Sequence, residues 1–236
     1  MRATILILFT LLFSVTESYS QADAKHLIRT LNQQFAKVHD YSADVLMQFN
    51  LPGVKMNDMQ GKVFYKKPDK FRIKAKGIFF LPKQNPMQQI GAILQDTNSY
   101  TAVISGYEKI QNSECAVVNI IPLRQDVDLI LGKFWIKTIN PQVVKSQITS
   151  KQNGTVESES KYNDKISSHL PSSIFVTMEM NKIKMPKMMA ADLNKKSSPK
   201  TSSGLQKEKG KIELHFSNYK INTKLSDAVF VDTENE

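Results

Sequence analysis

The sequence predicts a mainly β protein in which an antiparallel sheet follows an N-terminal helix. Three observations lead to this prediction. Apolar and polar residues alternate with a period of two in repeated stretches from residue 41 onward. Short turn sequences separate these stretches, as expected for hairpins. The segment before them has apolar residues at helical spacing instead.

Residues 1–20 have the features of a secretory signal peptide. Arg2 supplies the positive charge, an apolar run follows, and a small-x-small cleavage site ends at Ser20. The run is too short to span a bilayer, and no later stretch reaches about 18 uninterrupted apolar residues. We therefore expect an exported, soluble protein that begins near Gln21 and forms a single domain over residues 21–236.

The net charge of +10 is concentrated in one segment. Residues 182–211 contain nine lysines and two acidic residues, a local balance of 9 − 2 = +7, and are rich in serine and proline. Such a composition is typical of a flexible loop. Either this loop only aids solubility, or it is a basic arm, from Lys182 to Lys211, that rests on an anionic membrane surface. Export and the absence of aromatic residues in the arm argue against nucleic acid as a partner.

The helix is predicted from Asp23 to His39. Its apolar residues recur on one face, basic residues occupy the opposite face, and Asp23 is suited to the N-cap position. The apolar face must therefore lie on the sheet. A strictly alternating strand follows from Tyr41 to Phe49, with Val45 on the same side as both of these residues.

Residues 59–77 predict a hairpin with one apolar and one basic face. Val63 and Tyr65 share a side in its first strand, and Phe71 and Ile73 do so in its second. A proline followed by an aspartate suits a tight turn between them, with the proline at the first corner position. A sheet built from such ribbons must bury its apolar side against something.

A short helix is predicted over residues 87–94, after an apolar stretch at 77–81 that we expect to form a short strand. Met87, Ile90 and Leu94 share one face of this helix. A glycine in its middle weakens it by about 1 kcal/mol relative to alanine. The segment is a candidate lid, although a helix that only caps the end of a barrel fits the pattern equally well.

The rest of the chain is predicted to consist of strands and turns. An Asn-Gly pair marks one hairpin, because both of its corner positions require positive φ. Phe134 and Ile136 face away from Trp135. We expect about nine to eleven strands in all, joined by short loops and therefore antiparallel. The later strands are expected at residues 100–107, 114–121, 133–139, 143–149, 155–161, 174–180 and 212–216.

The sequence contains no recognisable catalytic or metal-binding motif. Its four histidines are scattered, and none has a second ligand-type residue at metal-binding spacing. There is no phosphate-binding glycine loop and no nucleophile elbow, and the single Cys115 lies in an apolar run. We therefore expect a protein without enzyme activity, cofactor or metal.

Several segments resemble the LolA-like lipoprotein-sorting proteins of the Gram-negative periplasm. After the signal peptide, helix and first strand, the resemblance continues through residues 61–73 (GKVFYKKPDKFRI), 134–137 (FWIK), 143–155 and 216–222, with Phe230. It covers most of the mature chain. The fold of this family is an unclosed, strongly curved antiparallel half-barrel whose apolar concave face is covered by helices. Its members carry the acyl chains of lipoproteins from the inner to the outer membrane.

The resemblance implies a periplasmic carrier, expected to be a monomer, that binds an acyl chain of a lipoprotein or lipid. It also implies an inner-membrane donor complex and an outer-membrane acceptor. Lys67 occupies the position of an arginine that fastens the lid in the best-known carriers, and is the candidate latch, with a point charge in place of a planar fork. The implied cavity lining is Val45, Met47, Phe49, Val63, Tyr65, Phe71, Ile73, Phe134 and Ile136, with Met87, Ile90 and Leu94 on the lid.

Two other interpretations remain open. Related half-barrels occur in periplasmic regulators of envelope stress, where the cavity senses lipid and a partner protein is bound. Alternatively, the concave face is filled by the protein's own side chains, and the alternating residues are only core.

Overall fold

The computed structural model of this 236-residue chain describes residues 21–52, 56–75, 86–152, 154–163, 169–179 and 209–231. The expected signal peptide, the expected strand at 77–81 and most of the basic segment lie outside these ranges. Within them, no helix is both long enough and apolar enough to cross a membrane.

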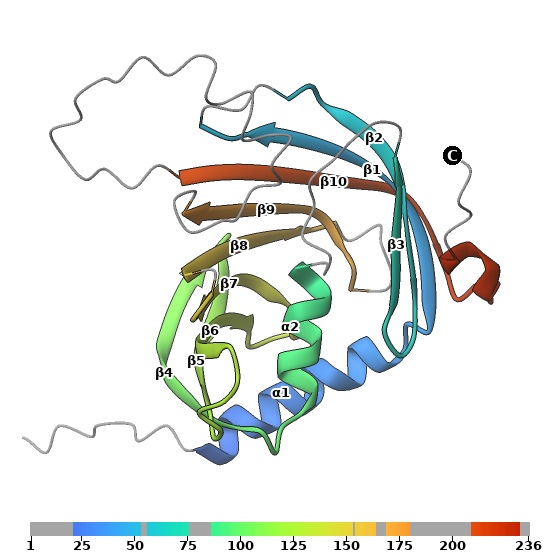
Figure 1. Ribbon diagram of the computed structural model, residues 1–236. Coiled ribbons are helices and arrows are strands. Elements are labelled where there is room, and N and C mark those ends of the chain that lie inside the picture. Colours follow the sequence, from blue (N-terminus) through green and yellow to red (C-terminus); the bar gives the residue numbers. More distant parts are fainter. Residues whose placement is uncertain are drawn as a thin grey trace, which may run out of the picture.

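The described residues form one sheet of ten strands, and every pair of neighbouring strands is antiparallel. The sheet curves without closing, so β3 and β4 are its two edges (Figure 1). This confirms the predicted fold class, a mainly β, unclosed and curved antiparallel half-barrel. The strand order is β3-β2-β1-β10-β9-β8-β7-β6-β5-β4. The strands are β1 (Asp40–Asn50), β2 (Met59–Lys66), β3 (Lys70–Ala75), β4 (Tyr100–Ile110), β5 (Ser113–Pro122), β6 (Leu129–Lys137), β7 (Val143–Ser150), β8 (Gly154–Tyr162), β9 (Pro171–Glu179) and β10 (Lys209–Ile221).

Two α-helices, α1 (Gln21–Ala36) and α2 (Pro86–Gln95), lie on the concave side of the sheet (Figure 1). A short 3-10 helix, η2 (Asp227–Phe230), follows β10 and lies beside β3. The prediction placed both ends of α1 two to three residues too far along the sequence. Asp23 lies in the first turn and is not the N-cap, and the helix ends at Ala36, before His39.

Asn222 explains why α1 ends where it does. Its Nδ2 donates a hydrogen bond to the Lys37 carbonyl (2.9 Å), and its Oδ1 accepts one from the His39 backbone N–H (2.7 Å). One side chain thus satisfies an unpaired carbonyl at the helix end and fixes the start of β1. A residue 183 positions away makes this contact, so helical periodicity alone could not predict it.

Two further details differ from the prediction. Lys209 and Lys211, which the sequence placed in the basic loop, belong to β10, because Gly210 and Ile212 continue the inward-facing alternation of that strand. The β2–β3 hairpin forms as predicted, but the Lys67–Pro68 peptide bond in its turn is cis.

Candidate functional site

The concave face of the sheet is an apolar surface with a polar break in its middle. Register places one row of side chains across eight strands, from β1 to β4. The row is apolar at both ends and carries two serines at its centre. Its members, in order, are Phe49, Ile212, Val176, Ser158, Ser146, Phe134, Val118 and Ile104.

On the β4–β7 side of the serines lies a set of packed residues that we call the helix cluster. It joins α1 and α2 to strands β4–β7, and Leu31, Leu94 and Phe134 are at most 1% exposed. Fully buried Leu or Phe side chains of this kind stabilise a fold by about 1.5–3 kcal/mol each. The buried members are Ala24, Ile28, Leu31, Ile90, Leu94, Tyr100, Ala102, Ile104, Ala116, Val118, Ile120, Phe134, Ile136 and Val143.

On the other side lies a second set, the strand cluster, which has no member from α1 or α2 among the described residues. Its buried centre contains Val45, Met47 and Val63. Further apolar side chains, most of them large, pack against this centre and are only partly buried. These partly buried residues are Tyr41, Phe49, Met56, Met59, Phe71, Ile73, Ala75, Val156, Phe216 and Tyr219.

The two ends of the strand cluster differ chemically. Tyr41 stands close to Tyr65 and Tyr219, with ring centroids 5.3 and 5.7 Å away. The Tyr219 hydroxyl donates to the Pro171 carbonyl (2.8 Å), and burial raises the pKa of Tyr219. Burial also raises the pKa of Tyr65, with a smaller effect from the charge of Asp69. This end therefore presents neutral aromatic rings with polar tips.

The other end is rich in methionine. Met47 and Met59 are directly opposite each other on β1 and β2, and Met56 and Met178 belong to the same cluster. Methionine side chains are flexible and polarisable, so they adapt to irregular apolar shapes. A surface of this kind suits a guest without a fixed shape.

Buried serines separate the two clusters. The Oγ atoms of Ser146 and Ser158 lie 2.7 Å apart, and these residues are 2% and 5% exposed. Ser160, also buried, lies two residues further along β8. Of the Ser146 and Ser158 hydroxyls, one donates a hydrogen bond to the other, and because serine is uncharged this polar break is neutral. Sequence reasoning missed it, although serines alternate with Glu157 and Glu159 along β8.

The structure divides the predicted lining residues between the two clusters. Val45, Met47, Phe49, Val63, Phe71 and Ile73 all belong to the strand cluster, and Tyr65 contacts its Tyr41. Phe134 and Ile136 belong to the helix cluster and are 0% exposed. In this structure these two residues lie beneath α1 and α2 as packed core, so their place in the implied lining stays a prediction.

Helix α2, the predicted lid, is fastened at its C-terminal end. The Leu94 carbonyl accepts hydrogen bonds from Asn32 Nδ2 of α1 (2.8 Å) and from the Tyr100 hydroxyl of β4 (3.0 Å). Ile90 and Leu94 face the helix cluster, and the side chain of Met87 lies outside the described part. Burial, with a smaller effect from Asp96, raises the pKa of Tyr100 to about 12.

Lys67, the predicted latch, contacts α1 in this structure. Its Nζ donates to the Ala36 carbonyl (2.7 Å), and its backbone N–H donates to the His39 carbonyl (2.9 Å). No hydrogen bond joins it to α2 within the described residues. It therefore ties the turn of the β2–β3 hairpin to the end of α1, where a cation is favoured by the helix dipole.

The described residues contain no group of three or more His, Cys, Asp or Glu side chains that could hold a metal ion. Cys115 is buried in a separate cluster with Val117, Trp135 and Val144, on the opposite face of the sheet from Phe134. Burial raises the pKa of its thiol. A raised pKa disfavours the nucleophilic thiolate, so this cysteine acts as a small apolar core residue.

Solved structures with the same architecture include three bacterial proteins. A DUF1329 family protein from Desulfovibrio piger matches with a TM-score of 0.57 and 11% identity, over 91% of this chain and 98% of that chain. A protein domain from Vibrio parahaemolyticus, described as an outer membrane lipoprotein-sorting protein domain, matches with a TM-score of 0.56 and 9% identity, over 89% and 97%. A LolA superfamily protein from Nitrosomonas europaea matches with a TM-score of 0.54 and 11% identity, over 89% and 97%.

No family model matches the sequence, and no curated protein matches it. The likeness therefore lies in the three-dimensional arrangement of the chain, at sequence identities of 9–11%. On this evidence the protein has a LolA-like fold.

Proposed function

We propose that this protein is a periplasmic carrier that binds the acyl chains of a lipoprotein or lipid on the strand cluster. The observation that carries the proposal is the set of partly buried, mostly large apolar side chains that pack against the centre of the strand cluster. Contact between apolar side chains and water is unfavourable. A hydrocarbon guest that covers these side chains removes their exposed apolar surface from water. The names of two structural neighbours, which refer to lipoprotein sorting and to the LolA superfamily, support the same class of guest.

Energetics dictate how such a guest would be released. Burial of each CH₂ group contributes ~0.8 kcal/mol. Transfer of an acyl chain of about fifteen methylenes from an apolar site into water would therefore cost ~12 kcal/mol of free energy. The carrier must therefore pass the chain directly from one apolar site to another. We infer an inner-membrane donor and an outer-membrane acceptor as the two sites.

Lys67 and α2 would set how easily the strand cluster becomes accessible. Lys67 holds the β2–β3 hairpin against α1, and this hairpin carries Val63, Phe71 and Ile73 of the strand cluster. We infer that movement of the hairpin away from α1, with α2 pivoting about its fastened Leu94 end, opens the concave face. Competition between closure and guest binding then sets the affinity.

The proposal is tested by purifying the protein from a bacterial envelope, extracting it with organic solvent and identifying co-purified lipid by mass spectrometry. A fluorescent fatty acid then measures the affinity of the lipid-free protein. We expect acylated lipid in the extract, and a loss of about tenfold or more in probe affinity for Phe71→Ser combined with Ile73→Ser.

Phe64→Ser is the matched control, because Phe64 lies on the same hairpin between Val63 and Tyr65 and faces the opposite side of the sheet. It should leave probe affinity unchanged. An extract without lipid, together with no probe binding, would show that the concave face serves only as core. Stable capture of one envelope protein by the lipid-free form would instead favour a regulator.

A further inference from the structure

The outer face of the β2–β3 hairpin is basic. Alternation sends Phe71 and Ile73 to the concave side, so the residues between them point outward. β3 is an edge of the sheet, and this basic face therefore adjoins the margin of the half-barrel (Figure 1). The basic residues on this face are Lys62, Lys66, Lys70, Arg72 and Lys74.

The sheet register places four of these lysines directly opposite one another. Lys62 is paired with Lys74, and Lys66 is paired with Lys70. Like charges at directly opposed positions of an antiparallel pair repel each other and destabilise the sheet. An anion that bridges each pair would offset this repulsion.

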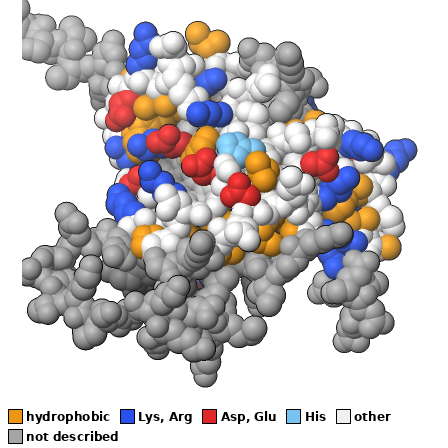
Figure 2. All heavy atoms as spheres, turned by 90° about the horizontal axis from the view of Figure 1, so that it is seen from above, with side chains coloured by type: hydrophobic (Ala, Val, Ile, Leu, Met, Phe, Trp, Pro, Cys, Tyr) orange, Lys and Arg blue, Asp and Glu red, His pale blue; other side chains and the backbone are white. Residues whose placement is uncertain are grey.

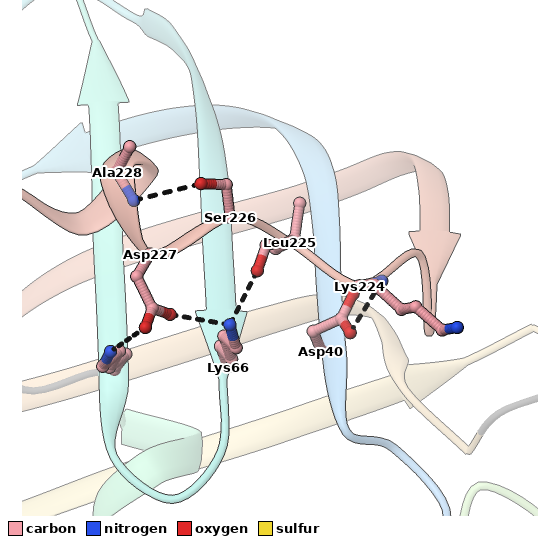
Figure 3. A network of polar contacts seen from close by, with 8 residues as sticks. Asp40, Lys66, Lys224, Leu225, Ser226, Asp227 and Ala228 are labelled. Atoms are coloured by element: carbon pink, nitrogen blue, oxygen red, sulfur yellow. Dashed lines mark hydrogen bonds and ion pairs between the residues drawn. The ribbon is translucent and has the colours of Figure 1, made fainter.

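The Lys66–Lys70 pair already holds such an anion. Asp227, in η2, lies between the two ammonium groups, with Oδ1 2.6 Å from Lys66 Nζ and Oδ2 3.0 Å from Lys70 Nζ (Figure 3). Lys66 also donates to the Leu225 carbonyl (2.8 Å). The two lysines lower the pKa of the Asp227 carboxyl. The chain's own C-terminal segment thus shows how this face binds a group with two acceptor oxygens.

The Lys62–Lys74 pair has no bridging carboxylate among the described residues. Asp44 Oδ1 lies 3.3 Å from Lys62 Nζ, while its Oδ2 accepts a hydrogen bond from Asn218 Nδ2 (2.8 Å) and not from Lys74; the Lys62 side chain stays 49% exposed. Both lysines line a groove of about 910 Å³ that crosses β3, β2, β1 and β10, and whose walls also include Gln60 and His215. Figure 2, viewed from above β1 and β2 of Figure 1, shows basic side chains at the surface with acidic ones between them.

We propose that this face, centred on the Lys62–Lys74 pair, docks the protein onto an anionic phospholipid bilayer. A lipid phosphate offers the same pair of acceptor oxygens that Asp227 offers to Lys66 and Lys70. The position fits transfer as well, since β3 carries Lys74 on one face and Phe71 and Ile73 of the strand cluster on the other. A bilayer held here lies beside the margin of the concave face. This last point rests on the proposed function, whereas docking itself does not require a guest.

The experiment is co-sedimentation of the full mature chain, freed of lipid, with vesicles. One set contains phosphatidylcholine alone and the other also contains phosphatidylglycerol. We expect binding only to the anionic vesicles, weakening as salt increases. Each basic residue near such a surface contributes about a fivefold change in partitioning. Lys62→Gln with Lys74→Gln should therefore reduce binding about 10- to 30-fold.

The matched control is Lys109→Gln with Lys161→Gln, which removes the same charge from β4 and β8. It should bind anionic vesicles like the parent. Asp227→Asn should strengthen binding severalfold, because it frees the Lys66–Lys70 pair for lipid. If the contact of Asp227 with Lys66 and Lys70 only holds the hairpin in place, Asp227→Asn should instead bind anionic vesicles more weakly than the parent.

Three results would overturn the proposal. The first is parent-like vesicle binding by the Lys62/Lys74 variant. The second is loss of binding only when Lys195, Lys196 and Lys200 of the basic arm are changed to glutamine. The third is binding to soluble poly-glutamate without co-sedimentation with either kind of vesicle. That result would identify an acidic protein as the partner. Because the protein is lipid-free throughout, none of these results depends on whether the concave face carries a guest.

Discussion

The helix cluster and the strand cluster lie on the same concave face, and one cross-strand row runs through both. They differ in what covers them. In the first, α1 and α2 pack on β4–β7 until Phe134 and Ile136 are fully buried. In the second, residues such as Phe71 and Ile73 remain partly buried, and none of the α1 or α2 side chains that the structure describes belongs to the cluster. The same alternating pattern thus builds a fully buried core at one end and a partly buried apolar surface at the other.

Under the proposed function, this difference separates stability from binding. A residue whose burial is complete contributes to the free energy of unfolding, whereas a partly buried residue on the same face contributes less and retains area for a guest. The serine pair marks the boundary between the two regions. The predictions that follow test this division, from the largest expected effect to the smallest.

Truncating one aromatic ring in each cluster should lower stability to different extents. Phe134→Ala removes a fully buried ring and should lower the free energy of unfolding by about 3–5 kcal/mol. Phe71→Ala removes a partly buried ring and should cost only about 1 kcal/mol, while weakening fatty-acid binding. Urea denaturation and probe titration measure the two effects. Equal losses of stability would show that the two regions are packed alike.

The serine boundary can be tested with a double-mutant cycle. Ser146→Val leaves the buried Ser158 hydroxyl without its partner and should cost about 1–3 kcal/mol. Adding Ser158→Val removes the orphaned group and should recover most of that loss. Urea denaturation of all four proteins gives the coupling energy. Additive losses would mean that the 2.7 Å contact does not stabilise the fold.

Tyr100→Phe tests the fastening of α2. Loss of the hydroxyl leaves the Leu94 carbonyl with its bond from Asn32, so we expect a loss of about 1 kcal/mol and faster amide exchange in α2. Exchange in β9 should be unaffected and serves as the internal control. Unchanged protection of α2 would show that this bond does not hold the helix.

The same residue should give the protein an alkaline sensitivity. The pKa of Tyr100 is raised to about 12 from an ordinary value of 10.0, so between these values the folded state keeps a proton that the unfolded state has lost. The free energy of unfolding must then fall as pH rises from 10 to 12, and is unaffected by this group below pH 10. In thermal unfolding scans at several pH values, Tyr100→Phe should lose less stability than the parent between pH 10 and 12. Identical slopes in parent and variant would contradict this assignment.

Lys67→Ala should have the smallest effect on stability, because the bond from its Nζ to Ala36 is at the surface. We expect a loss of less than 1 kcal/mol in the free energy of unfolding, but faster exchange at the β2–β3 hairpin and a higher on-rate for fatty acid. Lys66→Ala, on the neighbouring residue that contacts the C-terminal segment, is the comparison. Equal on-rates for parent and Lys67→Ala would argue that the hairpin does not gate access.

Local patterns in the sequence were sufficient to predict most of the fold. Period-two alternation located the β2–β3 hairpin, and helical spacing located α2, because both depend on residues close together in the chain. The end of α1 and the start of β10 were misplaced for the opposite reason. Asn222, which hydrogen-bonds the end of α1, is far from that helix in the sequence. The composition around Lys209 is typical of a loop, and only its pairing with Glu179 shows that it belongs to a strand.

The candidate site depends more than the fold does on contacts between distant parts of the chain. Alternation identified which residues share a face, so six of the nine proposed lining residues fall in the strand cluster. It could not show that Phe134 and Ile136 sit under helices, since coverage depends on how distant elements pack. Alternation alone showed that the lysines of β2 and β3 share one basic face. That Lys62 lies opposite Lys74, and Lys66 opposite Lys70, could be known only from the register of the two strands.

The central claim, that a guest binds to the strand cluster and not within the helix cluster, is tested most directly by photo-crosslinking. A fatty acid with a diazirine near the end of its chain would be bound to the parent protein, irradiated and mapped by peptide mass spectrometry. We predict adducts in the peptides of β1, β2 and β3, around Met47, Met59 and Phe71. Adducts confined to α2 and β6, around Leu94 and Phe134, would contradict the account.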